Sequence, residues 1–230
     1  MVNSVFLRKV YLFNELGEKE LSKIQTISAE KRFPRHHVVF MENDVADGLY
    51  IVKAGSVKVF RSTEEGKEKI LAIFSEGEVF GEMSLLDGGV RSATVQTLEE
   101  THLIQIKRND FINLITQNPE VSARIITTLS HRLRKSNEQI EMMAFWDVRS
   151  RIIKVLYDLA QEHGVVTENG IKIRLRLTHQ DLANMAATSR ETVTRVLQEL
   201  HDMGVFNMFD KYIMLSDIKQ KTMGRMRESI

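Results

Sequence analysis

Residues 177–206 read LTHQDLANMAATSRETVTRVLQELHDMGVF, and their pattern is the clearest structural signal in the C-terminal part of the chain. Its apolar residues recur at the three- and four-residue steps that are typical of helices. They are Leu182, Met185, Val193, Val196, Leu197 and Leu200. Residues 186–188 are small enough for close packing, and Ser189 suits an N-cap because its hydroxyl accepts a free backbone N–H. The stretch therefore predicts two short helices joined by a tight turn.

The outward positions at the start of the second helix carry side chains that can read DNA. These positions are Arg190, Glu191, Thr194 and Arg195. An Arg side chain can pair with O6 and N7 of guanine, and a Glu side chain can accept from N4 of cytosine. In a helix-turn-helix, the second helix enters the major groove and its first residues contact base edges. The pattern favours this motif, and an ordinary helical hairpin with a charged, solvated face stays open as the alternative.

Residues around the two helices complete the expected DNA-binding domain. Thr178, Ser189 and Thr192 carry hydroxyls near the helix starts, where they can contact phosphate. Residues 165–177 are expected to form a hairpin that turns at residues 168–170, and residues 204–215 a second hairpin, or wing. The tail is basic, with Lys219, Lys221, Arg225 and Arg227.

The composition is that of an ordinary globular protein. Of 230 residues, 43% are hydrophobic and 27% are charged, and the net charge is +1. No apolar run is long enough to span a bilayer, and residues 1–10 lack a secretory signal pattern. The absence of Cys excludes disulfides, thiolate metal sites and Cys-ligated iron–sulfur clusters. We therefore expect a cytoplasmic location and no membrane partner, with any DNA-binding surface arising from local placement of basic residues.

Residues 37–107 have the pattern of short strands separated by glycines. The strand candidates are residues 38–40, 49–52, 57–60, 70–74, 93–95 and 103–106. Many of them alternate in polarity or carry β-branched and aromatic residues. Several short strands with such turns predict a small antiparallel sandwich or jelly roll.

A long helix is expected from about Pro119 to Phe145, because proline is favoured in the first turn of a helix. Alternating steps of three and four residues form a heptad seam along it. The seam contains Ile126, Leu129, Leu133, Ser136, Ile140 and Met143. It favours a two-fold dimer, and an amphipathic helix packed on its own domain is the alternative. Ser136 is the polar member of the seam, which suggests a polar partner there. A further helix is expected over residues 148–163.

The loop at residues 80–95 reads FGEMSLLDGGVRSATV and has the groups needed to hold a phosphate and a ribose. Ser84-Leu85-Leu86 suits a single helical turn whose free backbone N–H groups can bind an anion. Arg91 can hold a phosphate bidentately, and Ser92 can add a hydroxyl. Glu82 can accept a hydrogen bond from a ribose 2′-OH. A structural ion pair between Glu82 and Arg91 that closes the loop is the alternative.

Taken in order along the chain, these segments resemble the cyclic-AMP receptor protein family, the CRP/FNR-type bacterial transcription regulators. The loop resembles the phosphate-binding cassette of cyclic-nucleotide-binding domains. Residues 144–148, AFWDV, resemble the end of the dimer helix and the hinge, and residues 189–195, SRETVTR, resemble the recognition helix of the cyclic-AMP-responsive branch. The resemblance implies an α+β chain with a cyclic-nucleotide-binding β jelly roll at 1–118. A dimerisation helix at 119–146 and a winged helix-turn-helix domain at 147–230 would follow.

The same resemblance implies a function and a set of site residues. It implies a regulator that is not an enzyme and that binds a palindrome with TGTGA-like half-sites as a homodimer. Cyclic AMP would be its effector, binding would shift a population between conformations, and RNA polymerase would be its partner. The effector-binding residues would be Gly81, Glu82, Met83, Ser84, Arg91, Ser92, Ala93, Arg132, Ser136 and Asn137. The DNA-binding residues would be Thr178, His179, Ser189, Arg190, Glu191, Thr192, Thr194 and Arg195.

Two departures from the family pattern bear on the effector. The best-known cyclic-AMP binders carry Thr then Ser at the base-contacting pair, whereas this chain has Ser136 then Asn137. Ser136 keeps the hydroxyl that would meet the adenine amino group, while Asn137, from the partner subunit, can both donate and accept. The cassette is also one residue shorter than in some bacterial members. Because Asn137 can both donate and accept, cyclic GMP stays open as the effector.

Other functions have weaker support in the sequence. Relatives in the family sense oxygen, nitric oxide, carbon monoxide or small metabolites, and some need no effector. A haem bound through His stays formally open, and the effector-independent version is the main alternative. A cupin-type metal enzyme would need a cluster of His and carboxylate ligands inside the barrel, and the strand block has no His-x-His pair. We therefore expect no metal.

Overall fold

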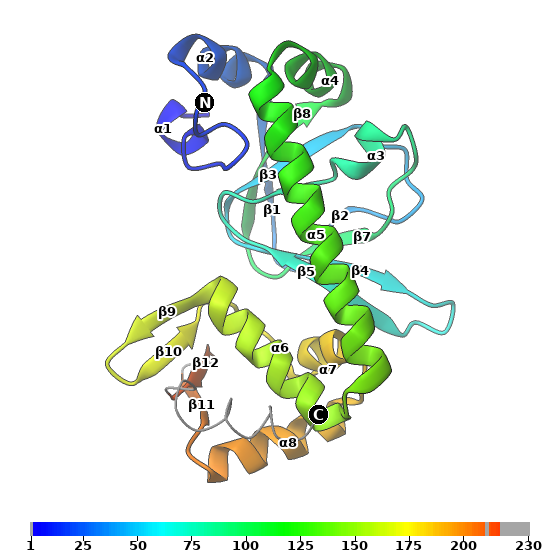
Figure 1. The fold of residues 1–230 in the computed structure, drawn as a ribbon, viewed down its shortest axis with the longest axis vertical. Helices are drawn as coiled ribbons and strands as arrows, with labels where there is room; N and C mark the ends of the chain where they lie inside the picture. The colour runs from blue at the N-terminus through cyan, green and yellow to red at the C-terminus, as the bar shows by residue number, and fades with distance from the viewer. Residues whose placement is uncertain (1, 210–211, 217–230) are drawn as a thin grey trace. The chain divides into compact units, whose positions relative to one another are not determined.

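The computed structural model describes residues 2–209 and 212–216, so the basic residues of the tail lie outside the described part. Contacts between Cα atoms divide the chain into two compact units, Met1–Ile140 and Glu141–Ile230. The division falls inside the long helix α5 (Pro119–Phe145), whose bounds agree with those expected from the sequence. Figure 1 shows α5 as the long green helix.

The first unit is built on short antiparallel strands. They are β1 (Ser28–Phe33), β2 (Val38–Phe40), β3 (Gly48–Ala54), β4 (Val57–Ser62), β5 (Glu68–Phe74), β6 (Val79–Phe80), β7 (Thr94–Thr97) and β8 (Thr101–Lys107). One sheet has the order β1-β8-β3-β6, and the other has the order β2-β7-β4-β5. This alternation of strands between two sheets is the jelly roll that the sequence predicts.

Two apolar clusters hold the first unit together. Between the sheets, Tyr50, Phe80 and Leu103 of one sheet pack with Val57 and Val95 of the other. On the outer face of the β1-β8-β3-β6 sheet, apolar residues of β3 and β8 pack against helices and against the first turns of α5. These helices are α1 (Ser4–Leu7), α2 (Glu18–Ile27) and α4 (Arg108–Gln117). The start of α5 is thereby fixed to the jelly roll through Val121 and Ile125.

Two strands were not predicted from the sequence. Strand β1 has the polar sequence SAEKRF and no buried residue, so it carries no alternating pattern. It forms because each of its residues pairs with one of β8, from Ser28 with Ile106 to Phe33 with Thr101. Strand β6 has only two residues, which pair with β3 directly before the cassette. Tertiary pairing therefore decides both strands, and local sequence does not.

The second unit contains the expected helix-turn-helix between two hairpins. Its elements are α6 (Val148–His163), β9 (Gly164–Thr167), β10 (Gly170–Ile173), α7 (His179–Ala186), α8 (Arg190–Asp202), β11 (Phe206–Phe209) and β12 (Tyr212–Leu215). The strands form one sheet in the order β11-β12-β10-β9. The hairpins lie where the sequence predicts them, and the β11–β12 pair is the wing.

Candidate effector site and nucleic-acid interface

The cassette of the first unit is a turn of helix between two tight loops. Helix α3 (Met83–Leu86) covers the residues expected to form a single turn. Gly81 precedes it with a φ of +80°, a left-handed conformation that favours glycine. A Cβ at this position would lie 2.7 Å from Nη1 of Arg91, so space also requires glycine here. The backbone of Gly81 is therefore in direct reach of the Arg91 guanidinium.

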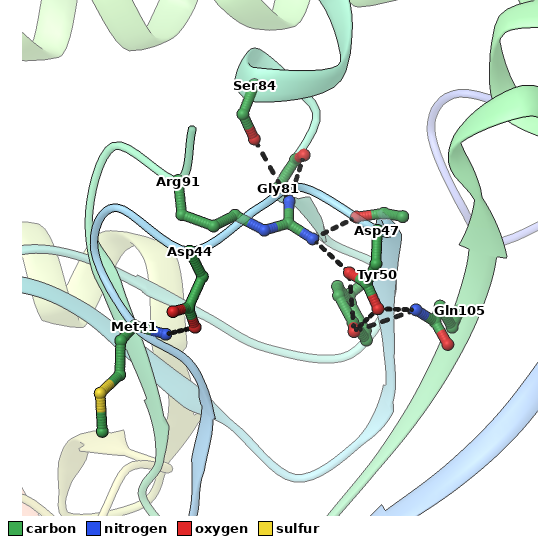
Figure 2. A network of polar contacts seen from close by, with 9 residues as sticks. Met41, Asp44, Asp47, Tyr50, Gly81, Ser84, Arg91 and Gln105 are labelled. Atoms are coloured by element: carbon green, nitrogen blue, oxygen red, sulfur yellow. Dashed lines mark hydrogen bonds and ion pairs between the residues drawn. The ribbon is translucent and has the colours of Figure 1, made fainter. Parts of the chain in front are cut away.

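Arg91 is almost fully buried, with 1% of its surface exposed, and it is surrounded by oxygen atoms (Figure 2). Its Nη1 donates to the carbonyl of Gly81 at 2.8 Å and to the hydroxyl of Ser84 at 3.3 Å. Its Nη2 donates to Oδ1 of Asp47 at 2.7 Å and to the carbonyl of Gly48 at 2.7 Å. The guanidinium carbon also lies 4.1 Å from the centre of the Phe40 ring. Arg91 thus joins the cassette to the start of β3.

The ion pair between Glu82 and Arg91 that was the alternative to a ligand site is not formed, and each residue has another partner. Glu82 pairs through Oε1 with Arg132 of α5, which also donates to the carbonyl of Val79. The Arg132 guanidinium lies 4.6 Å from the centre of the Phe74 ring. Arg91 pairs with Asp47 instead. The alternative in which this loop is closed by a Glu82–Arg91 salt bridge is therefore wrong.

Two buried polar atoms of the cassette have no hydrogen-bond partner among the described residues: Oε2 of Glu82 and Nε of Arg91. A buried polar group without a partner costs free energy, roughly 1–3 kcal/mol by general experience, so each such atom calls for an explanation. The first is a free acceptor and the second a free donor. Together they suit a ligand that has both a hydroxyl and an anionic oxygen, as a ribose phosphate does.

Sequence reasoning missed three residues that hold Arg91 in place. Asp47 accepts from Arg91, and its other oxygen accepts from the side-chain amide of Gln105 at 2.6 Å. The hydroxyl of Tyr50 lies 3.2 Å from Asp47 and 3.1 Å from the amide of Gln105. Burial, followed by the Asp47 charge, raises the pKa of Tyr50, so its hydroxyl remains a donor. The one sequence signal for this network is a polar residue inside an otherwise apolar strand, as Gln105 is in β8.

The remaining predicted effector residues lie at different depths. Ala93 is buried, Ser92 is exposed, and Met83 is 49% exposed. Ser136 and Asn137 are exposed on α5, as are the seam residues Ile126 (65%), Leu133 (64%) and Ile140 (66%). A row of uncovered apolar side chains is unusual on a surface that faces water only.

The helix-turn-helix of the second unit has the predicted caps. The Thr178 hydroxyl accepts from the backbone N–H of Asp181, whose carboxylate accepts in turn from the N–H of Thr178, so the two form a capping box. Ser189 caps α8 by accepting from the N–H of Thr192 at 3.2 Å. Between the helices, Ala187 is left-handed with a φ of 51°. These contacts fix where α7 and α8 begin and how they turn.

Helix α8 buries its apolar face and exposes the predicted reading face. Val193, Val196, Leu197 and Leu200 are buried. Arg190, Glu191, Thr194 and Arg195 line an open hollow on the outer side of the helix, with Gln198, Glu199 and Asp202. Their exposure leaves them able to meet a second molecule.

Polar contacts organise this outer face. The Thr194 hydroxyl lies 2.9 Å from Nδ1 of His179, and it donates to the carbonyl of Arg190 at 2.9 Å. Nη1 of Arg195 donates to Glu199 at 3.2 Å. The backbone N–H of Glu191, followed by the Ser189 hydroxyl, lowers the pKa of the Glu191 carboxyl. Glu191 is therefore a carboxylate at neutral pH and can only accept hydrogen bonds.

Comparison with known proteins places both units in one family. The cyclic nucleotide-binding domain family matches residues 30–118, and the Crp-like helix-turn-helix domain family matches residues 150–220. The cyclic AMP receptor protein of Thermus thermophilus is 34% identical over 86% of this chain and 88% of its own. The chain belongs to the cyclic AMP receptor protein family. It is a transcription regulator with a cyclic nucleotide-binding domain and a DNA-binding helix-turn-helix domain, and it is not an enzyme.

Other members of the family show the range of the resemblance. The CRP-like cAMP-activated global transcriptional regulator of Mycobacterium tuberculosis is 33% identical over 80% of this chain and 83% of its own. The c-di-GMP responsive global regulator CLP of Xanthomonas campestris has a similar fold, with a TM-score of 0.75. It is 28% identical, and the match covers 87% of this chain and 100% of that one. Regulators with this fold thus respond to more than one nucleotide.

Two further features bear on the other classes considered. Within the described ranges 2–209 and 212–216, no group of three or more His, Cys, Asp or Glu residues is placed to hold a metal ion. In the same ranges, no helix combines the length and the apolar character needed to cross a membrane.

Proposed function

We propose that this regulator is a homodimer whose binding to a TGTGA-like palindrome is controlled by cyclic AMP in the cassette. The observation that carries the proposal is the pair of unpartnered buried atoms, Oε2 of Glu82 and Nε of Arg91. A cyclic nucleotide offers both a ribose 2′-OH, which donates, and a cyclic phosphate, which accepts. The two atoms are therefore complementary to one ligand, and the cyclic nucleotide-binding family match covers them both.

In this proposal, different residues of the cassette bind the ribose and the phosphate of the ligand. Glu82 accepts from the 2′-OH through Oε2, while its Oε1 stays with Arg132. Arg91 donates to the phosphate through Nε. A second donor would come from Nη2, which would then leave Gly48 or Asp47. The Ser92 hydroxyl and the backbone of residues 81–84 and 93 complete the phosphate contacts.

Residues of α5 would hold the base. Ser136 and Asn137 are both exposed, and Arg132 of the same helix reaches Glu82. The Ser136 hydroxyl would accept from the adenine amino group, and Asn137 of the partner subunit would add a second contact. The effector then bridges the cassette and two copies of α5.

The exposed seam of α5 supports the homodimer. Ile126, Leu133 and Ile140 would pack against their copies, since they follow a heptad repeat and are about two-thirds exposed in the single chain. A two-fold dimer presents two copies of α8, which match a palindrome when they lie about one DNA turn, roughly 34 Å, apart.

In the DNA complex, Arg190, Glu191 and Arg195 would read base edges in the major groove. The phosphates would be contacted or positioned by Thr178, His179, Ser189, Thr192 and Thr194. Cyclic AMP would act by favouring the conformation in which both copies of α8 reach their half-sites. Bound in this way in the cytoplasm, the protein would present a surface to RNA polymerase.

One observation favours a second candidate, a regulator that binds DNA without an effector or with another nucleotide. The Nη1 and Nη2 atoms of Arg91 already donate to four protein acceptors, so the cassette is largely satisfied by the protein itself. In that case the affinity for DNA would not depend on cyclic AMP.

Isothermal titration calorimetry of the full chain with cyclic AMP, cyclic GMP and 5′-AMP tests the effector. We expect cyclic AMP to bind more tightly than the other two. Glu82→Gln should weaken that binding by about tenfold or more, because the amide keeps an acceptor at only one of the two positions that Arg132 and the ribose hydroxyl would use. Glu76→Gln is the matched control, since Glu76 lies on the exposed surface next to Lys9. Binding of cyclic AMP that is the same in Glu82→Gln and wild type would contradict the proposal.

A further inference from the structure

Arg151 of α6 donates to three backbone carbonyls that belong to two different turns of the second unit. Its Nε lies 3.0 Å from the carbonyl oxygen of Ala186, and its Nη2 lies 3.2 Å from that of Ala187. Its Nη1 lies 3.3 Å from the carbonyl oxygen of Trp146. One guanidinium thus contacts both the residue that follows α5 and the turn between α7 and α8.

These carbonyls are the ones that helix ends leave without intrahelical partners. Helix α5 ends at Phe145 and helix α7 ends at Ala186, and the last carbonyls of a helix have no N–H of the next turn to accept from. A cation at a helix C-terminus is also favourable because the helix dipole is negative there. Arg151 therefore caps both helix ends with one fixed, planar fork of donors.

The contact depends on where α5 ends. If α5 continued as a helix through Trp146, the carbonyl of Trp146 would accept from the N–H of Ser150. That N–H now donates to Oδ1 of Asp147, the N-cap of α6, at 2.8 Å. Continuation would thus compete with Arg151 for the carbonyl of Trp146 and with Asp147 for the N–H of Ser150. Arg151 would then keep only its two contacts with the helix-turn-helix.

We propose that Arg151 is a positioning residue that links the end of α5 to the turn before the recognition helix α8. Ala187 in this turn is left-handed, a conformation that costs a residue other than glycine free energy, and Arg151 holds its carbonyl. A change of conformation at the end of α5 alters the turn between α7 and α8 through the contacts of the Arg151 guanidinium. Binding of DNA to α8 alters the surroundings of Trp146 through the same contacts. The inference rests on the DNA-reading role of α8 and extends it to a residue that contacts no DNA.

Trp146 provides a direct readout, because it is the only tryptophan in the chain. Unlabelled TGTGA-type duplex is titrated into the full chain with cyclic AMP present while tryptophan emission is recorded. Binding is followed in parallel by the anisotropy of a labelled duplex. In wild type we expect the emission to change along the same curve as the anisotropy. In Arg151→Met we expect the emission change to fall by at least half at saturation, measured at DNA concentrations that compensate for weaker binding.

Lys154→Met is the matched control, because Lys154 is a cation of the same helix that forms an ion pair with Asp158 at 2.5 Å. This variant should respond as wild type does. Arg151→Lys keeps the charge but lacks the fork, and it serves as the second variant if Arg151→Met does not fold. We expect its emission change to fall by at least half as well.

Acrylamide quenching of Trp146 without DNA supplies a second readout. The quenching constant should rise about twofold in Arg151→Met, since a freed carbonyl permits local opening of the chain there. If DNA binds and the emission of Trp146 does not change in wild type, or changes equally in Arg151→Met, the inference is wrong. If no duplex binds, the proposed function is wrong, and the DNA titration does not bear on Arg151. An unchanged quenching constant in Arg151→Met without DNA would overturn the inference by itself.

Discussion

Nη2 of Arg91 lies 2.7 Å from Oδ1 of Asp47, and this ion pair joins the cassette to the residue that directly precedes β3. The two partners differ in environment, because the Arg91 side chain is 1% exposed and the Asp47 side chain is 55% exposed. The arginine therefore cannot move away without leaving buried oxygens unpaired, whereas the aspartate can exchange its partner for water. Arg91 is therefore held in place, whereas Asp47 can be replaced by water as the acceptor of the Nη2 hydrogen bond.

Asp47→Asn should tighten the binding of cyclic AMP by about threefold while lowering the free energy of unfolding by about 1 kcal/mol. The variant removes a carboxylate that would repel the phosphate, and it weakens a charge-assisted hydrogen bond to Arg91. Calorimetry with cyclic AMP and urea unfolding measure the two quantities. Weaker binding in the variant would mean that Asp47 orients Arg91 for the phosphate and does not compete with it.

Arg195→Ala should weaken the free energy of binding to the preferred duplex by about 1–3 kcal/mol and relax specificity at one base pair. In the free protein Arg195 pairs with Glu199 at 3.2 Å on the same exposed face, so it is already extended along α8. The measurement compares the variant on the palindrome and on duplexes altered at single positions. An equal loss on every duplex would make Arg195 a phosphate contact.

Leu133→Asp should convert the proposed homodimer into a monomer without unfolding the chain. Leu133 is 64% exposed, so the substitution removes little packing within the chain, but it places a charge in the middle of the seam. Sedimentation equilibrium gives the mass, and circular dichroism checks the fold. Arg134→Asp is the control, because Arg134 is exposed on α5 but lies outside the seam. A variant Leu133→Asp that remains dimeric would show that the dimer uses another surface.

Asp147→Ala should destabilise the second unit by about 1 kcal/mol at neutral pH, because Asp147 is the N-cap of α6. The backbone N–H of Ser150 lowers the pKa of the Asp147 carboxyl. This contribution is therefore present above the unfolded pKa of about 4 and is lost as the pH falls through the lower folded pKa. Thermal unfolding of both proteins between neutral and acid pH should show the difference shrinking below about pH 4. A difference that is constant with pH would contradict a charged cap.

The sequence predicts the helices from α5 onward because their limits are set by local groups, whereas α1, α2 and α4 were not predicted. Pro119 begins α5, Asp147 caps α6, and Thr178 and Ser189 cap the helices of the DNA-binding motif. Strand β1 escaped prediction because only its pairing with β8 makes it a strand. Of the apolar seam that was predicted from its spacing, Ile126, Leu133 and Ile140 are exposed, whereas Leu129 packs against the core of the first unit. The role of the seam in a dimer stays a prediction.

The effector-binding role of the candidate residues stays a prediction, and the contacts that these residues make within the chain were not predicted. Gly81, Glu82 and Arg91 lie close together in the sequence, so the loop could be recognised. The partners of Arg91 and Glu82 lie 44 and 50 positions away, at Asp47 and Arg132, and only the packing of β3 and α5 brings them there. The same separation hides the contact of Arg151 with Ala186, which joins two elements 35 positions apart.

Control of DNA binding by cyclic AMP is tested by the fluorescence anisotropy of a labelled TGTGA-type palindrome, titrated with the full chain at fixed salt. Because affinity for DNA depends strongly on salt, both titrations use one buffer, with and without cyclic AMP. We expect cyclic AMP to tighten binding by about tenfold or more, which lies within the usual range of coupling between two sites. Tight binding that is unchanged by cyclic AMP would contradict the proposed control and leave a DNA-binding regulator that responds to another ligand or to none.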